Sequence, residues 1–232
     1  MKNKATFLEN IEGRIILMTT KTEKSYIEFK FEPNDILLAG SESAGVPEDI
    51  HQQLNAKKFE TVEIAEMVLS GGINKSLVQA INAAGGRAVG ISGKDAGLIV
   101  AKQMREDLGV AGEPVETNVE VLDVLAAADP GFIPVVSPIS AGPEGGSYNV
   151  NADTAAGVLA SALGASRLML LTDIEGVMDD EGNLLTRLTT KDARDLISDG
   201  TAKGGMIPKL ETCIQALEDG VDAVVILDGR RA

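Results

Sequence analysis

The sequence predicts an α/β protein, a three-layer α/β/α sandwich around a mostly parallel sheet. Short apolar runs bounded by polar or glycine residues, which are typical of buried strands, alternate along the chain with segments whose apolar residues recur at helical spacing. In addition, 44% of the residues are hydrophobic and 24% are charged, the ordinary composition of a globular protein with a real core. Strands separated by helices favour parallel pairing, with helices on both faces of the sheet.

The first predicted elements are two strands and a long helix. The strands are residues 14–20 (RIILMTT) and 35–40 (DILLAG), which are short, apolar and bounded by polar or glycine residues. From Glu60 onward the apolar residues follow a helical period that stops at AAGG, residues 83–86. Because Gly71 and Gly72 lie inside this helix, we expect it to bend there.

The remaining elements alternate between strand and helix. The predicted strands are RAVGIS (87–92), FIPVVSPI (132–139), RLMLLTD (167–173) and DAVVILDG (222–229). The predicted helices are NVEVLDVLAAAD (118–129), ADTAAGVLASALG (152–164), KDARDLISDG (191–200), which Thr190 can cap, and MIPKLETCIQALEDG (206–220). In parallel sheets of this kind, ligands bind at the carboxyl ends of the strands.

Charge and cysteine content exclude several function classes. The net charge is −14, with 35 acidic and 21 basic residues, which disfavours binding to nucleic acid or to an anionic membrane surface. The single cysteine, Cys213, cannot form an internal disulfide, and we expect it to be buried on the apolar face of its helix. No apolar leader or bilayer-spanning run is present, so the sequence predicts a cytoplasmic protein.

The first candidate site is SYNVNADTAAG, residues 147–157. If this segment is extended up to Asn151, strand alternation places Asn149 and Asn151 on one face, and Asp153 follows at the start of a helix. Two interpretations of Asp153 remain open. It is either the helix cap, the commonest use of Asp at a helix start, or a carboxylate that organises a ligand site.

Two further candidate sites lie closer to the carboxyl end. In GTAKGGMIPK (200–209), paired glycines and a helix start can receive an anion, and Lys209 adds a positive charge one turn into the helix. A glycine-rich turn with a solvated lysine is the alternative. In LLTDIEGVMDDEG (170–182), a strand ends at Thr172 and Asp173, where an α/β sheet places ligand contacts. A β-turn with acidic loop residues is the alternative there.

Taken together, these segments resemble the acetylglutamate kinases of the amino acid kinase family. The resemblance covers residues 60–229, nearly three quarters of the chain, and includes the segments at 62–99, 147–166, 168–179 and 199–230 in the family's order. It implies an amino acid kinase fold and ATP-dependent phosphorylation of the side-chain carboxylate of N-acetyl-L-glutamate, an early step of arginine synthesis. Within a domain at 58–232, it implies a substrate part up to about residue 148 and a nucleotide part from about residue 149.

The resemblance also implies roles for individual residues. Asn149 resembles a contact to the acetylglutamate substrate, Asp153 a carboxylate that orients catalytic lysines, and Lys209 the lysine that stabilises charge on the transferring phosphoryl group. The expected nucleotide contacts are Asp173, Gly176, Val177, Met178, Thr201 and Lys203. These roles suit phosphoryl transfer, which needs positive charge and donors around the phosphoryl oxygens, and Mg²⁺ is expected to arrive with the ATP.

The amino-terminal strands depart from this family. Its Lys-Tyr-Gly-Gly-Asn strand, its His-Gly-Gly-Gly loop and its substrate-clamping Arg do not occur in the 232 residues. Impaired turnover, or an inactive nucleotide-binding protein, is therefore an open alternative. Residues 14–54 instead resemble part of the SPOUT tRNA 2′-O-methyltransferases, in which GSESAGVP (40–47) would lie against S-adenosylmethionine. We therefore predict a methyltransferase-like fragment at 1–57, and its partial pocket leaves a methyltransferase remnant as a further alternative.

The last two predictions concern the oligomeric state and the single histidine. The long helix from Glu60 has a wide apolar stripe, and the resemblance implies that it forms a homodimer interface. His51, the single histidine, lies in a polar segment where no neighbouring residue is placed to orient it, so we expect a surface residue rather than a base or metal ligand.

Overall fold

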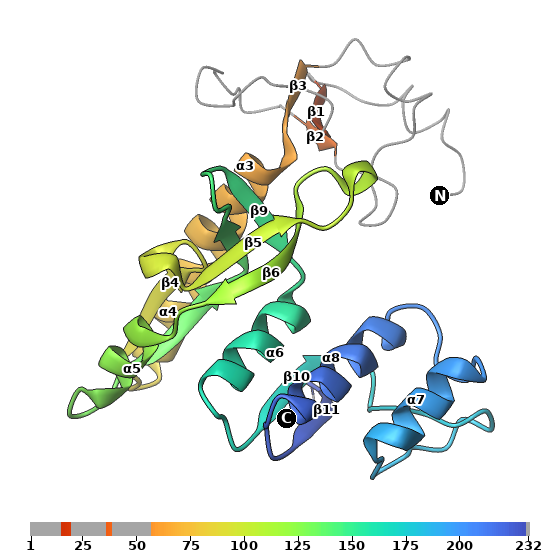
Figure 1. Ribbon diagram of the computed structural model, residues 1–232. Helices are drawn as coiled ribbons and strands as arrows, with labels where there is room; N and C mark the ends of the chain where they lie inside the picture. The colour runs from red at the N-terminus through yellow and green to blue at the C-terminus, as the bar shows by residue number, and fades with distance from the viewer. Residues whose placement is uncertain (1–14, 20–35, 39–56, 231–232) are drawn as a thin grey trace.

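The computed structural model describes residues 15–19, 36–38 and 57–230, coloured in Figure 1. Three strands, β1 (Ile15–Thr19), β2 (Ile36–Leu38) and β3 (Lys57–Glu60), form a parallel sheet in the order β2-β1-β3. Both amino-terminal strands predicted from the sequence are thus confirmed. β3 spans the predicted boundary at residue 57 and pairs with β1. The GSESAGVP loop and His51 lie outside the described residues.

The long helix is irregular where the glycines predict it. It begins as α3 (Thr61–Glu66), continues as a π-helical segment η2 (Met67–Ile73) that contains Gly71 and Gly72, and ends as α4 (Asn74–Ala83). Asn74 connects α4 to two neighbouring strands. Its buried side-chain amide donates hydrogen bonds to the carbonyls of Ile91 (3.1 Å) and Val135 (2.8 Å). Those carbonyls belong to β4 (Ala88–Ser92) and β7 (Ile133–Ser137), which pair in parallel.

A four-stranded closed barrel follows, and the sequence predicts it only in part. Its strands are β5 (Ile99–Gln103), β6 (Ala111–Thr117), β8 (Ile139–Ala141) and β9 (Ser147–Val150), paired in the order β5-β6-β9-β8. β5 and β6 are absent from the predicted elements, because Gly112 and Pro114 interrupt the strand pattern of β6 and acidic residues alternate with them. The short helix η3 (Asp95–Gly97) precedes β5, the short helix η4 (Glu106–Leu108) connects β5 to β6, and the helix α5 (Glu120–Ala127) follows β6.

The carboxyl-terminal part contains α6 (Ala152–Ala162), β10 (Leu168–Thr172), α7 (Thr190–Ser198), α8 (Met206–Glu218) and β11 (Val224–Asp228). Every one of these elements is predicted from the sequence. β10 and β11 pair in parallel, and α6 stands between the barrel and α8 in Figure 1. Ala155 of α6 belongs to the barrel core, and Ala160 of the same helix packs in a cluster with Cys213 of α8. α6 therefore joins the two parts.

The α/β class with mostly parallel strand pairing is confirmed. The ladders are separate in the described residues: three parallel sheets and the barrel take the place of one continuous sheet. One cap prediction is wrong by a residue. Thr189 rather than Thr190 caps α7, in a reciprocal capping box with Asp192, whose side chain accepts from the Thr189 backbone N–H at 2.8 Å. None of the helices described has the length and apolar character needed to cross a membrane.

Candidate functional site

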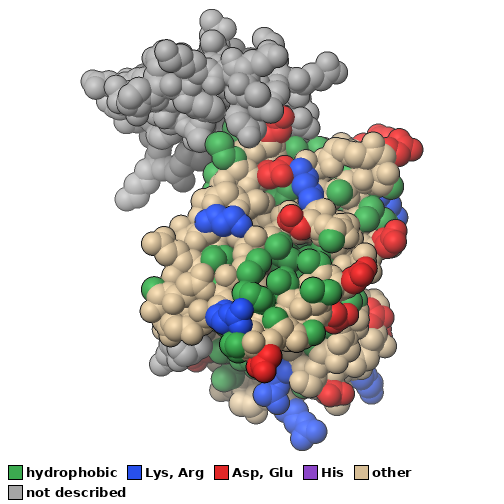
Figure 2. All heavy atoms as spheres, turned by 90° about the vertical axis from the view of Figure 1, so that its left-hand side faces the viewer, with side chains coloured by type: hydrophobic (Ala, Val, Ile, Leu, Met, Phe, Trp, Pro, Cys, Tyr) green, Lys and Arg blue, Asp and Glu red, His purple; other side chains and the backbone are tan. Residues whose placement is uncertain are grey.

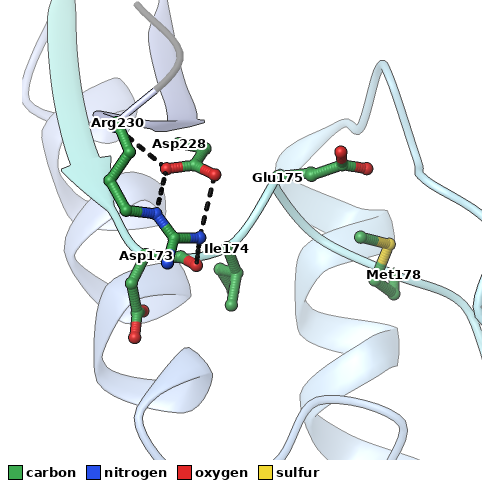
Figure 3. A pocket seen from close by; sticks show the side chains of 6 residues that line it. All are labelled: Asp173, Ile174, Glu175, Met178, Asp228 and Arg230. Atoms are coloured by element: carbon green, nitrogen blue, oxygen red, sulfur yellow. Dashed lines mark hydrogen bonds and ion pairs between the residues drawn. The ribbon is translucent and has the colours of Figure 1, made fainter.

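The carboxyl ends of β10 and β11 form one wall of a cavity of about 600 Å³. The register pairs Thr172 with Asp228, so both strands end side by side. In Figure 3, Arg230 and Asp228 stand on one side of this cavity, and Glu175 and Met178 stand on the other. The residues that line it are Asp173, Ile174, Glu175, Met178, Asp228 and Arg230. A cavity at the ends of parallel strands is where this class of fold binds ligands.

Arg230 ties the loop after β10 to the end of β11. Its guanidinium donates to both carboxylate oxygens of Asp228, each at 2.9 Å, and also to the backbone carbonyl of Asp173 (Figure 3). Asp228 is buried, with 7% of its surface exposed, whereas the Arg230 side chain is largely exposed. Hydrogen bonding to Asp228 raises the pKa of Arg230, so its charge is permanent. The sequence analysis missed both residues, although their place at the end of the last strand is a usable signal.

The loop from Asp173 to Met178 divides into lining and supporting residues. Asp173 and Met178 line the cavity. Gly176 and Val177 are buried instead, and Val177 packs against α7 and α8 in a hydrophobic cluster. Gly176 has a φ of 154°, and a Cβ atom there would lie 2.9 Å from the end of the Leu184 side chain, so a larger residue would strain the backbone and displace Leu184.

Asp153 and Lys209 meet between α6 and α8. The Lys209 ammonium donates to Asp153 Oδ2 at 2.5 Å, and both side chains are between one fifth and one quarter exposed. The helix-cap interpretation of Asp153 is wrong, because Asn151 caps α6: its side-chain oxygen accepts from the backbone N–H groups of Asp153 (2.9 Å) and Thr154 (3.1 Å). The Asp153 carboxylate is thus left to pair with Lys209 across 56 positions of sequence.

Cys213 lies one helical turn after Lys209 and is buried, as predicted. Burial is the main cause that raises the pKa of its thiol from 9.0 to about 11, and the negative charge of Asp153 adds to the effect. The thiol therefore stays protonated at neutral pH. We assign it a packing role beneath the ion pair.

The glycine-rich segment before α8 contributes no residue to the lining of the strand-end cavity. Thr201 donates its backbone N–H to Asp199 Oδ1 at 2.9 Å, and Ala202, which is buried, donates to the Leu196 carbonyl at 2.8 Å. Lys203 is exposed, and Gly204 has a φ of 54°. The loop is therefore anchored at its start and presents its lysine to solvent before α8 begins at Met206.

Asn149 lies in β9, in the barrel part. It is exposed, and its backbone N–H donates to the Val110 carbonyl at 2.9 Å. The predicted shared face with Asn151 does not form, because β9 ends at Val150 and Asn151 turns to cap α6. Across the described residues, no group of three or more His, Cys, Asp or Glu side chains is placed to hold a metal ion.

The chain is similar to known proteins along most of its length. The model of the amino acid kinase family matches residues 24–228. An acetylglutamate kinase of Parvibaculum lavamentivorans is 49% identical over 199 residues, covering 80% of this chain and 65% of that protein. An acetylglutamate kinase of Ruegeria pomeroyi is 56% identical over 170 residues, covering 73% of this chain and 58% of that protein. The chain thus spans between 58% and 65% of the length of these two relatives.

Solved structures share the fold at low sequence identity. The protein smu.665 of Streptococcus mutans superimposes with a TM-score of 0.66 at 21% identity, covering 92% of this chain and 94% of that one. A carbamate kinase of Giardia has a TM-score of 0.58 at 15% identity, covering 94% of this chain and 93% of that one. These likenesses support the fold described above.

Proposed function

Because the chain belongs to the amino acid kinase family, we propose that it binds ATP and transfers the γ-phosphoryl group to the side-chain carboxylate of N-acetyl-L-glutamate. Two kinds of support exist. Relatives that carry the name acetylglutamate kinase are 49% and 56% identical to this chain, and the paired Lys209 and Asp153 provide a positive group of fixed direction. The reaction would serve arginine synthesis in the cytoplasm.

The Lys209–Asp153 contact is the observation that carries this proposal. The bond from the γ-phosphorus to the bridging oxygen of ATP breaks, a bond to a carboxylate oxygen of the acceptor forms, and ADP leaves. Catalysis then consists mainly of positioning and of stabilising negative charge on the phosphoryl oxygens. Asp153 holds the Lys209 ammonium at 2.5 Å, so this lysine needs little reorganisation to face the transferring group.

The chemistry of the acceptor explains why the proposed site needs no general base. The side-chain carboxyl of an acylated glutamate has an ordinary pKa near 4.3, so it is ionised at neutral pH and attacks without a general base. Mg²⁺ bound to ATP neutralises phosphate charge. Since such an ion is held largely by phosphate oxygens and water, it is compatible with described residues that offer no three-ligand cluster.

We place the nucleotide between the strand-end cavity and the start of α8. Asp173 and Met178 line the cavity, and Lys203 follows in the exposed loop before the helix. Three carboxylates and one guanidinium surround the cavity, a balance that suits the base and ribose better than the triphosphate. The phosphates are better received by Lys203, the helix start and Lys209. Asn149 is proposed as the contact to acetylglutamate.

Trapping the acyl phosphate tests the proposed reaction. The purified chain is incubated with ATP, Mg²⁺ and N-acetylglutamate, and hydroxylamine converts the acyl phosphate into a hydroxamate that is measured by its iron complex. We expect hydroxamate in proportion to ADP, and none with N-acetylglutamine, which lacks the accepting carboxylate. Binding of ATP in calorimetry without any hydroxamate would overturn the transfer step and would indicate a nucleotide-binding protein without this activity.

We further propose that the chain forms a homodimer through the long helix. Met67, Val68, Ile73 and Leu77 are each between 42% and 50% exposed, and they line a groove of about 500 Å³ with Gly72 and Ser76. Figure 2 shows hydrophobic side chains gathered in the middle of the corresponding face. Contiguous exposed apolar side chains are typical of protein interfaces.

Sedimentation velocity at micromolar concentration tests the homodimer. We expect the wild-type chain to sediment as a dimer and Leu77→Glu to sediment as a monomer, because a carboxylate in the apolar groove opposes association. Val124→Glu is the matched control, since Val124 is also exposed, at 65%, but lies on α5. A wild-type monomer at this concentration would contradict the proposal.

A further inference from the structure

The Glu66 carboxylate joins three segments that are far apart in sequence. Glu66 is the last residue of α3, at the point where the helix becomes π-helical. Lys94 donates to Oε1 at 2.8 Å and to Oε2 at 2.6 Å, and the Ser147 hydroxyl donates to Oε2 at 3.3 Å. The contacts span 28 and 81 positions of sequence. Glu66 and Lys94 are each about one third exposed, so the ion pair is partly shielded from water.

Both partners of Glu66 are themselves held in place. Ser147 is the first residue of β9 and is paired with Ala141 of β8. Lys94 follows β4, and its backbone N–H donates to the Ser92 hydroxyl at 3.3 Å. The Ser92 hydroxyl and backbone N–H both donate to Asp95 Oδ2, each at 2.7 Å. The ion pair therefore connects anchored backbone segments rather than two mobile surface side chains.

This network lies on the face of β9 that presents Asn149. Side chains two positions apart in a strand point to the same face, so Ser147 and Asn149 share one face, while Tyr148 and Val150 point into the barrel core. Two residues of strand span roughly 7 Å. Ser147 and Asn149 therefore lie close together on the same face of β9.

We propose that Glu66 is a positioning residue for the acceptor substrate: its carboxylate, held by Lys94, fixes the start of β9 and thereby the side chain of Asn149. The inference rests on the proposed function, because it takes Asn149 as the contact to acetylglutamate. It goes further by assigning a role to three residues, Glu66, Lys94 and Ser147, on which the phosphoryl-transfer scheme does not depend.

The test compares acceptor affinity with nucleotide affinity in four single variants and one double variant. Glu66→Gln removes the charge but keeps the shape, Lys94→Met removes the ammonium, and Ser147→Ala removes only the bond to β9. The matched control is Lys102→Met, which breaks the exposed Lys102–Glu113 pair of the same barrel, 3.3 Å long. The dissociation constants of N-acetylglutamate and of a non-hydrolysable ATP analogue are measured by calorimetry for each variant.

We expect Glu66→Gln and Lys94→Met to weaken acetylglutamate binding about tenfold and Ser147→Ala about threefold, with nucleotide binding changed less than twofold in all of them. Lys102→Met is expected to change neither. In the double variant Glu66→Gln/Ser147→Ala the losses should be less than multiplicative, because both single changes break the same contact. A merely structural role would weaken both ligands together, in step with the melting temperature.

Hydrogen exchange supplies a readout that needs no substrate. Exchange of the backbone N–H groups in residues 147–150 should accelerate in Glu66→Gln, while residues 168–172 of β10 stay unchanged. Unchanged exchange in 147–150, or unchanged acetylglutamate affinity beside a wild-type chain that binds it, would overturn the positioning role alone. A wild-type chain that binds nucleotide but no acetylglutamate would overturn the proposed function, and the positioning role with it.

Discussion

The carboxyl-terminal part of the molecule and the barrel hold their charged groups differently. In the carboxyl-terminal part, Lys209 and Asp153 pair directly between two adjacent helices, at 2.5 Å and about one fifth exposed. In the barrel, Asn149 faces solvent on a strand of four residues, and a carboxylate from another helix secures the start of that strand. The Lys209–Asp153 pair is thus held by two packed helices. The short strand β9 is held at its start by a hydrogen bond to Glu66.

This difference has a consequence for substitutions. Under the proposed function, a change in the Lys209–Asp153 pair removes a group that acts on the transferring phosphoryl group, so its effect should fall on the rate. Under the positioning role proposed for Glu66, a change in its contacts to Lys94 or Ser147 displaces Asn149, so its effect should fall on acceptor affinity. Substitutions at four further residues test the carboxyl-terminal side of this comparison.

Lys209→Ala should have the largest effect. Removing one preorganised donor to developing negative charge lowers kcat by about 10²–10³-fold in comparable sites, and we expect a loss of this size while the KM for ATP changes much less. Steady-state ADP release measures both constants. Lys191→Ala is the control, since Lys191 is an exposed lysine of α7. Equal losses in the two variants would contradict the special role of Lys209.

Cys213 should make stability depend on pH. Its folded pKa of about 11 lies above the ordinary value of 9.0, so its contribution is fully present below pH 9 and is lost as the pH rises toward 11. The shift corresponds to roughly 2 to 3 kcal/mol at most. Urea unfolding from pH 8 to 11 should show a steeper decline in the wild type than in Cys213→Ala. Parallel curves would contradict the burial of a protonated thiol.

Arg230→Ala should affect nucleotide binding rather than the rate. Its bonds to Asp228 and to the Asp173 carbonyl hold the loop that lines the cavity, and loss of this restraint should raise the KM for ATP roughly tenfold. Arg230→Lys keeps one charge but not the two-pronged contact, so we expect intermediate values. A fall in kcat at unchanged KM would show that Arg230 acts on the transition state instead.

Asn151→Ala should have the smallest effect. Together with Asn151→Asp, it distinguishes a helix-capping role of Asn151 from a substrate-binding role. Loss of the helix cap costs about 1 kcal/mol in the free energy of unfolding, and Asn151→Asp should restore most of it because Asp caps equally well. Chemical denaturation of both variants measures this. If Asn151→Asp restores stability but leaves acetylglutamate binding weak, Asn151 serves the substrate as well as the helix.

The elements of the carboxyl-terminal part are predictable because each has a local signal. Glycines follow the ends of the helices, and apolar runs mark β10 and β11. Asp153 and Lys209 lie in the first turns of α6 and α8. The barrel lacks such signals. β6 contains Pro114 and Gly112, and β8 has only three residues, so pairing with distant neighbours rather than local preference decides that they are strands.

The site residues that the sequence analysis missed depend on long-range contacts. Glu66 contacts Ser147 across 81 positions of sequence, and Arg230 contacts Asp173 across 57. No periodic pattern in a sequence predicts contacts at such separations. The residue that caps α6 could not be predicted either, but there the difficulty is local. Asn151 and Asp153 are both good caps, and only the backbone at the end of β9 decides between them.

The most direct test of the account is a double-mutant cycle of Lys209→Ala and Asp153→Ala on the rate of phosphoryl transfer, with hydroxamate as the readout. If Asp153 acts by holding the Lys209 ammonium, the double variant should be about as slow as Lys209→Ala alone, since the second change removes nothing further. Losses that multiply would show that the two residues act independently, and that result would contradict the paired site.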